Sequence, residues 1–163
     1  MEKEKLNLRF EKKFIIPLTS KYLVSHTLKS SELRFYNQFK QRVVNSIYLD
    51  SYKLKFFKQN VEGDNIRKKF RIRWYGIEAF KSKPILEVKK KINNLCDKTL
   101  YDLDEWEFTK SNDIINSLIS YLSQKNFEKN LINELKILEP TLFISYRRKY
   151  YMSKIINCRV TLD

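Results

Sequence analysis

The segment 67–75 alternates cationic and apolar side chains, and it constrains the fold more than any other part of the sequence. Successive side chains of an extended strand point to opposite faces, so Lys69, Arg71 and Arg73 would share one face. The apolar side chains that would share the other face are Phe70, Ile72 and Trp74. The pattern predicts a strand of an antiparallel sheet that is apolar on its core side and cationic on the other.

Four further segments place charged or polar side chains at every second position. The sets that would share a face are Arg9, Glu11 and Lys13; Glu87, Lys89 and Lys91; Tyr146, Arg148 and Tyr150; and Arg159, Thr161 and Asp163. Any one row could be the solvated outer face of a sheet. When several rows converge, their repulsion accumulates, so the repetition favours a polyanion as ligand.

The kind of cation indicates which anion is bound. Lysine dominates the basic residues, yet arginine stands at 71, 73, 148 and 159. The planar guanidinium group suits bidentate binding of phosphate better than an ammonium group does. We therefore expect a ligand that is rich in phosphate.

The composition narrows the class of protein. The 163 residues carry 33 Lys and Arg against 19 Asp and Glu, a net charge of +14, while 14% are aromatic. Such a chain should fold around a core and bind an acidic partner. The 2 glycines form no phosphate-binding loop, and the single histidine excludes His-based triads. Two widely spaced cysteines and the lack of a long apolar stretch predict a cytoplasmic protein without a transmembrane segment.

The order of the predicted elements gives the fold class. Strands are expected over 6–16, 42–49, 67–75, 83–92, 98–106, 140–152 and 156–162, and helices over 18–28, 52–59, 114–122 and 127–135. Strands and helices do not alternate strictly, which predicts a single α+β domain over 1–163 with a mostly antiparallel sheet. The core is expected to include Phe35, Phe39, Phe56 and Phe57.

A series of motifs occurs in order along nearly the whole chain. They are RFEKKF at 9–14, RVVNSIYLD at 42–50, RKKFRIRWYG at 67–76, EVKKK at 87–91, PTLFISYRRKYY at 140–151 and RVTLD at 159–163. Together they resemble the VTC-domain polyphosphate polymerases of the triphosphate tunnel metalloenzyme superfamily. The resemblance implies an antiparallel β-barrel, the triphosphate tunnel, with a few flanking helices and a basic lumen.

The resemblance also implies a function and a site. The function is a phosphotransferase that moves the γ-phosphate of ATP onto polyphosphate, with both substrates in the tunnel. The side chains matching the family's catalytic cations are Arg71, Arg73, Lys89 and Arg148, and those expected to bind phosphate are Lys13, Lys69, Lys91, Lys98, Tyr146 and Arg159. A divalent metal, Mn²⁺ or Mg²⁺, is implied as cofactor, and Glu11 and Glu87 are its candidate ligands here.

The resemblance stops at Asp163, before the family's later strand with a metal-binding glutamate in a Glu-x-Lys context. We therefore expect an incomplete, C-terminally truncated tunnel domain that binds phosphate polyanions but turns over ATP poorly. The open sheet edge should favour self-association.

Two other functions stay open. In a tunnel-type triphosphatase acting on inorganic or nucleoside triphosphate, water would replace polyphosphate as acceptor. A non-catalytic module could instead bind polyphosphate or RNA. Nucleic acid is the weaker expectation, because a stacking platform needs aromatic side chains among the cations rather than opposite them.

Overall fold

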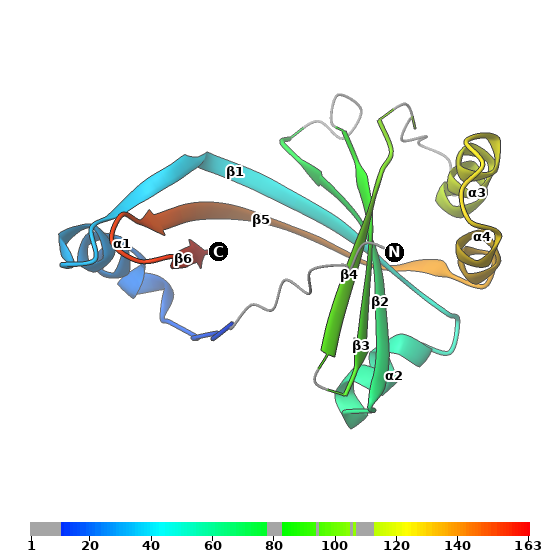
Figure 1. Ribbon diagram of the computed structural model, residues 1–163, viewed down its shortest axis with the longest axis horizontal. Coiled ribbons are helices and arrows are strands. Elements are labelled where there is room, and N and C mark those ends of the chain that lie inside the picture. Colours follow the sequence, from blue (N-terminus) through cyan, green and yellow to red (C-terminus); the bar gives the residue numbers. More distant parts are fainter. Residues whose placement is uncertain (1–10, 78–82, 94, 105, 107–112) are drawn as a thin grey trace, which may run out of the picture. The chain divides into compact units, whose positions relative to one another are not determined.

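The computed structural model describes residues 11–77, 83–93, 95–104, 106 and 113–163, and it is an α+β protein (Figure 1). Its elements are η1 (Leu18–Ser20), α1 (Lys21–Ser30), β1 (Phe35–Asp50), α2 (Lys55–Glu62), β2 (Ile66–Tyr75), β3 (Ile85–Ile92), β4 (Leu95–Asp102), α3 (Ile114–Gln124), α4 (Lys129–Leu135), β5 (Glu139–Ser153) and β6 (Arg159–Leu162). The predicted fold class is confirmed.

The strands form one six-stranded sheet in the order β4-β3-β2-β1-β5-β6. The pairs β1–β2, β2–β3, β3–β4 and β5–β6 are antiparallel. Within the described residues the order ends at β4 and at β6, so the sheet is open, as expected for an incomplete barrel.

The chain divides into two compact units, one of residues 42–147 and one of residues 1–41 with 148–163. Strands β1 and β5 each contribute one part to either unit. Each unit has a core of its own.

The core of the 42–147 unit lies on the apolar side of β2. Phe70, Ile72 and Trp74 are buried there, as the period-2 pattern predicts. Amphipathic helices α3 and α4 supply the facing side chains, which are Leu118, Leu122, Leu131 and Leu135. Burying the same sheet face against two helices fixes which face of β2 carries the cations.

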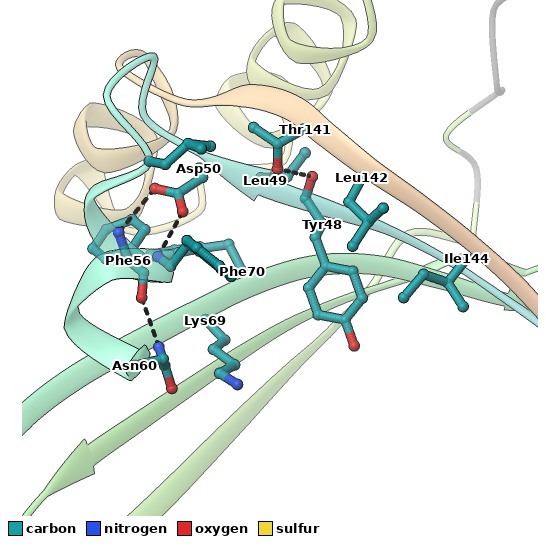
Figure 2. Close-up of a pocket in the computed structure, with 12 residues that line it drawn as sticks. Tyr48, Leu49, Asp50, Phe56, Asn60, Lys69, Phe70, Thr141, Leu142 and Ile144 are labelled. Atoms are coloured by element: carbon teal, nitrogen blue, oxygen red, sulfur yellow. Dashed lines mark hydrogen bonds between the residues drawn. The ribbon is translucent and has the colours of Figure 1, made fainter. Parts of the chain in front are cut away.

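Helix α2 is held by a buried carboxylate at the end of β1 (Figure 2). Asp50 Oδ1 accepts hydrogen bonds from the backbone N–H of Ser51 at 2.7 Å and of Phe56 at 2.9 Å, and its Oδ2 accepts one from Phe57 N–H at 2.8 Å. The bonds from Phe56 and Phe57 satisfy amide groups of the first helical turn. At the other end Gly63, with φ of 78°, closes the helix in the left-handed region, at the predicted turn.

The other unit packs α1 against the ends of β1 and β5 and against β6. Phe35, Tyr151 and Leu162 are buried there, with Val24 and Leu28 of α1 packed on them. The hydroxyl of Tyr151 donates a hydrogen bond to Ser25 Oγ at 3.0 Å. This small core holds β6 next to β5.

Several predicted boundaries are wrong. Of the strand predicted over 6–16, residues 6–10 with Arg9 lie outside the described residues, and 11–16 form no strand. Strand β1 begins at Phe35 rather than at 42; its first part is mostly exposed and lacks the run of buried side chains that marks its second part. Strand β4 ends at Asp102 instead of reaching 106.

The predicted aromatic core is only partly correct. Phe35 is buried and Phe56 packs against the core, but Phe39 is 41% and Phe57 60% exposed. None of the helices in the described part of the chain is long and apolar enough to cross a membrane.

Candidate phosphate-binding site

The strand register brings the cations of β2, β3 and β4 onto one side of the sheet. Arg71 lies opposite Glu87, Lys69 opposite Lys89, and Lys89 opposite Lys98. Directly opposed residues of antiparallel strands project to the same face. We call this surface the cationic face; its cations are Arg67, Lys69, Arg71, Arg73, Lys89, Lys91 and Lys98.

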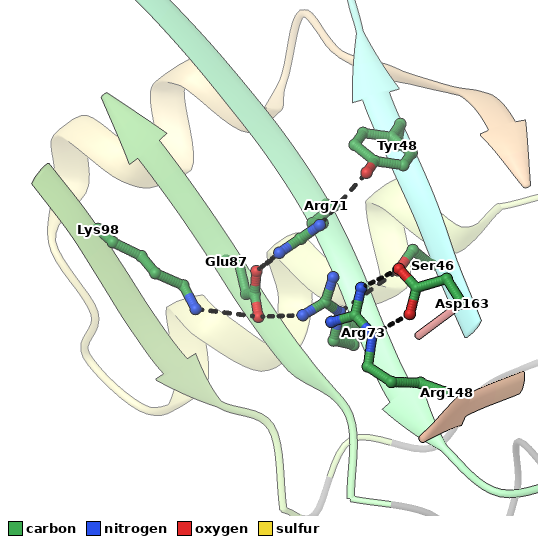
Figure 3. Close-up of polar contacts among 8 residues, drawn as sticks. All are labelled: Ser46, Tyr48, Arg71, Arg73, Glu87, Lys98, Arg148 and Asp163. Carbon is green, nitrogen blue, oxygen red and sulfur yellow. Dashed lines mark hydrogen bonds and ion pairs between the residues drawn. The ribbon is translucent and has the colours of Figure 1, made fainter. Parts of the chain in front are cut away.

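Glu87 lies at the centre of the cationic face and contacts three of its cations (Figure 3). Arg71 donates from Nε to Glu87 Oε2 at 2.5 Å and also pairs with it through Nη2. Arg73 Nη1 reaches Oε1 at 3.3 Å, and Lys98 Nζ lies 3.4 Å from the same oxygen. One carboxylate therefore faces three positive charges, so the cluster keeps a net positive charge.

Burial and neighbouring charges shift the pKa values of Glu87 and Arg71 in opposite directions. Burial alone would raise the pKa of Glu87, but Arg71, Arg73 and Lys98 outweigh it and hold the pKa below its ordinary value. Burial would lower the pKa of Arg71, while Glu87 and Tyr48 raise it above its ordinary value. Glu87 and Arg71 are therefore both charged at neutral pH.

Strand β1 pairs with β2 along the edge opposite to β3, and two of its side chains hold Arg71 and Arg73 in place. Tyr48 lies opposite Arg71, and its hydroxyl accepts a hydrogen bond from Arg71 Nη1 at 3.2 Å, with the guanidinium carbon 5.9 Å from the ring centroid. Ser46 lies opposite Arg73, and its Oγ accepts from Arg73 Nε at 3.5 Å. Sequence reasoning did not identify Ser46 or Tyr48, although their spacing of two within the motif at 42–50 places them on one face.

The centre of the cationic face is not a solvated outer surface. Arg73 is 8% and Glu87 5% exposed, whereas Lys69, Lys89 and Lys98 around them are exposed. Lys69, Lys89 and Lys91 make no ion pair with a described residue. A fixed arginine centre with accessible ammonium groups beside it is suited to an extended anion.

The remaining predicted cations lie in the other unit or apart from the cationic face. Arg148 donates from Nε and Nη2 to the two carboxylate oxygens of Asp163, each at 2.5 Å. Met152 lies opposite Arg159 in the β5–β6 register, so Arg148 and Arg159 share one face there. Lys13 is exposed outside any helix or strand, 3.7 Å from Glu11. Tyr146 is half-buried on β5 in the 42–147 unit.

The candidate metal ligands do not fit a divalent ion. Glu87 is engaged by three cations, and Glu11 is an exposed side chain beside Lys13. Among the described residues, no group of three or more His, Cys, Asp or Glu side chains could hold a metal.

The fold and this geometry define an α+β protein with an open antiparallel sheet, one face of which carries clustered cations. The chain belongs to the VTC domain family, whose model matches residues 8–163. This confirms the resemblance drawn from the motifs and places the protein in the tunnel-type, polyphosphate-related family of phosphotransferase-type enzymes. No curated protein matches the sequence.

Proposed function

We propose that the protein binds ATP and polyphosphate through the cationic face and transfers the γ-phosphate of ATP to the polyphosphate chain. The observation that carries the proposal is the arrangement of Arg71, Arg73 and Lys98 around a single carboxylate, Glu87. Membership of the VTC domain family supports phosphate chains as the ligand. Arg148 and Arg159, which share a face of the other unit, are separately proposed to bind phosphate.

The chemistry requires no nucleophile from the protein. A terminal oxygen of polyphosphate attacks the γ-phosphorus, the bond from that phosphorus to the β–γ bridging oxygen breaks, and ADP leaves. The polyphosphate then carries one more phosphate. The charge on the transferring phosphoryl group is met by preorganised cations, which is the main contribution a protein makes to such a reaction.

The arginines are suited to this role because they are held in place before a ligand arrives. Arg71 is fixed by Glu87 and Tyr48, and Arg73 by Glu87 and Ser46. Preorganised donors need little rearrangement as charge develops. A divalent metal that accompanies the nucleotide remains a prediction, and none of these steps depends on it.

The products distinguish this proposal from its main alternative. The protein is incubated with ATP and Mn²⁺ or Mg²⁺, and the products are separated by chain length. Long phosphate chains support the transferase, whereas free phosphate alone supports a triphosphatase with water as acceptor. If the variant Arg71→Ala forms neither product, the activity is assigned to the cationic face. Lys68→Ala is the control and should keep the activity, because Lys68 points to the opposite side of β2.

If no turnover is found, the third alternative is a binding module. Polyphosphate and RNA are then compared by filter binding at the same salt concentration, because both affinities depend on salt. We expect polyphosphate to bind more tightly. The aromatic side chains Phe70 and Trp74 of β2 are buried on the opposite face and cannot stack on bases at the cationic face. Self-association through the open sheet edge is proposed as well and would appear as a dimer in sedimentation.

A further inference from the structure

A pocket of about 450 Å³ lies within the 42–147 unit and adjoins the cationic face at Lys69 (Figure 2). Its walls come from β1, α2, β2 and β5. Its volume falls in the range of roughly 300–1,000 Å³ that is typical of small-molecule sites. No step of the proposed phosphate transfer makes use of it.

The walls of the pocket are apolar because most of their polar atoms are already bonded. The carboxylate of Asp50 accepts three backbone hydrogen bonds. Asn60 Nδ2 donates to the carbonyl oxygens of Phe56 and Lys68, and Thr141 Oγ1 donates to the carbonyl oxygen of Tyr48. A ligand in the pocket would therefore meet mainly carbon.

The apolar side chains of the walls are incompletely buried by the protein. Leu54 is 40%, Phe57 60%, Leu142 54% and Ile144 37% exposed. They come from α2, the segment before it and β5, and they face one cavity. Covering these surfaces with a flat apolar ligand would be favourable.

Two residues belong both to the pocket and to the cationic face. Tyr48 lines the pocket and hydrogen-bonds Arg71, and Lys69 lines the pocket and lies opposite Lys89. A ligand that fits both surfaces has an apolar ring system at one end and a chain of negative charges at the other. This charge pattern excludes a purely apolar occupant such as a hydrocarbon chain.

We propose that the pocket holds the nucleoside part of the nucleoside triphosphate, with the phosphates running along β2 from Lys69 toward Arg73. The inference rests on the proposed function and deepens it. Same-face residues of a strand are about 7 Å apart, so Lys69, Arg71 and Arg73 offer successive positions along a phosphate chain. With apolar walls, the base is recognised by stacking on its face, and preference among bases should be small.

The test compares ligands with and without a nucleoside. The full chain is titrated calorimetrically with ATP, GTP and tripolyphosphate. Tripolyphosphate carries at least as much negative charge as the triphosphate of ATP, so charge alone would make it the tighter ligand. We expect ATP and GTP to bind similarly, and both more tightly than tripolyphosphate.

The variant Phe57→Ala/Leu142→Ala removes two exposed wall side chains, and Val61→Ala is the control. Val61 is 69% exposed on the same helix and does not line the pocket. The double variant should bind ATP at least about fivefold more weakly, equivalent to about 1 kcal/mol, with tripolyphosphate affinity unchanged. In methyl NMR spectra of the wild type, Leu54, Leu142 and Ile144 should shift with ATP and not with tripolyphosphate.

Two outcomes would overturn the inference in distinguishable ways. If tripolyphosphate binds but ATP binds no more tightly, the nucleoside does not occupy the pocket. The same holds if the double variant weakens the binding of both ligands equally. In either case the cationic face is still the proposed phosphate-binding site. If neither ligand binds, the proposed function itself fails and the pocket assignment fails with it.

Discussion

Replacement of Glu87 by glutamine tests whether this carboxylate is the counter-ion of the cationic face. The substitution keeps the size and an acceptor oxygen of the side chain but removes the negative charge that faces Arg71, Arg73 and Lys98. At an effective dielectric near 20, attraction between unit charges at the 3.3 Å separation of Glu87 and Arg73 is about 5 kcal/mol. Desolvation opposes that attraction, so the net effect of the substitution is smaller.

Breaking one side of a buried ion pair usually costs about 3–5 kcal/mol. Because the glutamine oxygen still accepts hydrogen bonds, we expect Glu87→Gln to lose about 3 kcal/mol of folding free energy. For a chain of this size that is a fall in Tm of about 6–12 °C. An anion on the face should replace the missing charge, so tripolyphosphate should stabilise the variant more than the wild type.

The assay is urea or thermal unfolding of both proteins with and without tripolyphosphate. Glu134→Gln is the control, because Glu134 pairs with Lys68 at 2.5 Å on the other side of β2 and is 41% exposed. It should lose about 1 kcal/mol or less and show no recovery with tripolyphosphate. Equal stability of Glu87→Gln and wild type, or a loss that tripolyphosphate does not recover, would refute Glu87 as counter-ion of the face.

The contribution of Glu87 to the free energy of unfolding should depend on pH, and the direction of that dependence follows from its pKa. The pKa of Glu87 is lowered in the folded protein, so its stabilising contribution is fully present above the ordinary value of 4.5 and is lost as pH falls through the lower, folded value. The stability difference between wild type and Glu87→Gln should therefore be constant near neutral pH and shrink only below about 4.5. A difference that shrinks between pH 8 and 6 would contradict this origin.

Three further predictions concern the ligand, helix α2 and Arg148. Polyphosphate should raise the Tm of the wild type at low salt and less at high salt, and a Tm that polyphosphate leaves unchanged would oppose specific binding. Asp50→Ala should lower the free energy of unfolding by about 2 kcal/mol in urea, because three backbone N–H groups lose their acceptor; an unchanged value would show that Asp50 does not hold α2. Asp163→Asn should raise tripolyphosphate affinity severalfold in calorimetry by releasing Arg148, and unchanged affinity would remove Arg148 from the proposed ligands.

The residues of β2 show what the sequence could predict. The alternation over 67–75 assigned Phe70 and Ile72 to the core and Arg71 and Arg73 to the other face, and the structure confirms it. The period of two is a property of the local backbone, so it can be read without knowing any partner strand. Helices α3 and α4 were predictable for a similar reason, from their apolar periodicity.

The contacts of Glu87 show what the sequence could not predict. That Glu87 contacts Arg71 and Lys98 depends on the register of three strands, which tertiary pairing sets and no local pattern encodes. The capping of α2 by Asp50 depends in the same way on how the chain turns after β1. The pocket was missed because Phe57, expected in the core, is exposed at its wall.

The central claim is that one face of the sheet binds phosphate chains, and two adjacent lysines test it most directly. Lys69 belongs to the cationic face, while Lys68 lies on the other side of β2 and pairs with Glu134. Lys69→Ala and Lys68→Ala remove the same charge one residue apart, so their effects on overall electrostatics are matched. In calorimetric titrations with tripolyphosphate, Lys69→Ala should lose about 1.5–3 kcal/mol of binding free energy, roughly 12- to 160-fold in Kd, and Lys68→Ala should lose almost none. Equal losses for the two variants would mean that net charge, not the cationic face, binds the anion, and would contradict the account.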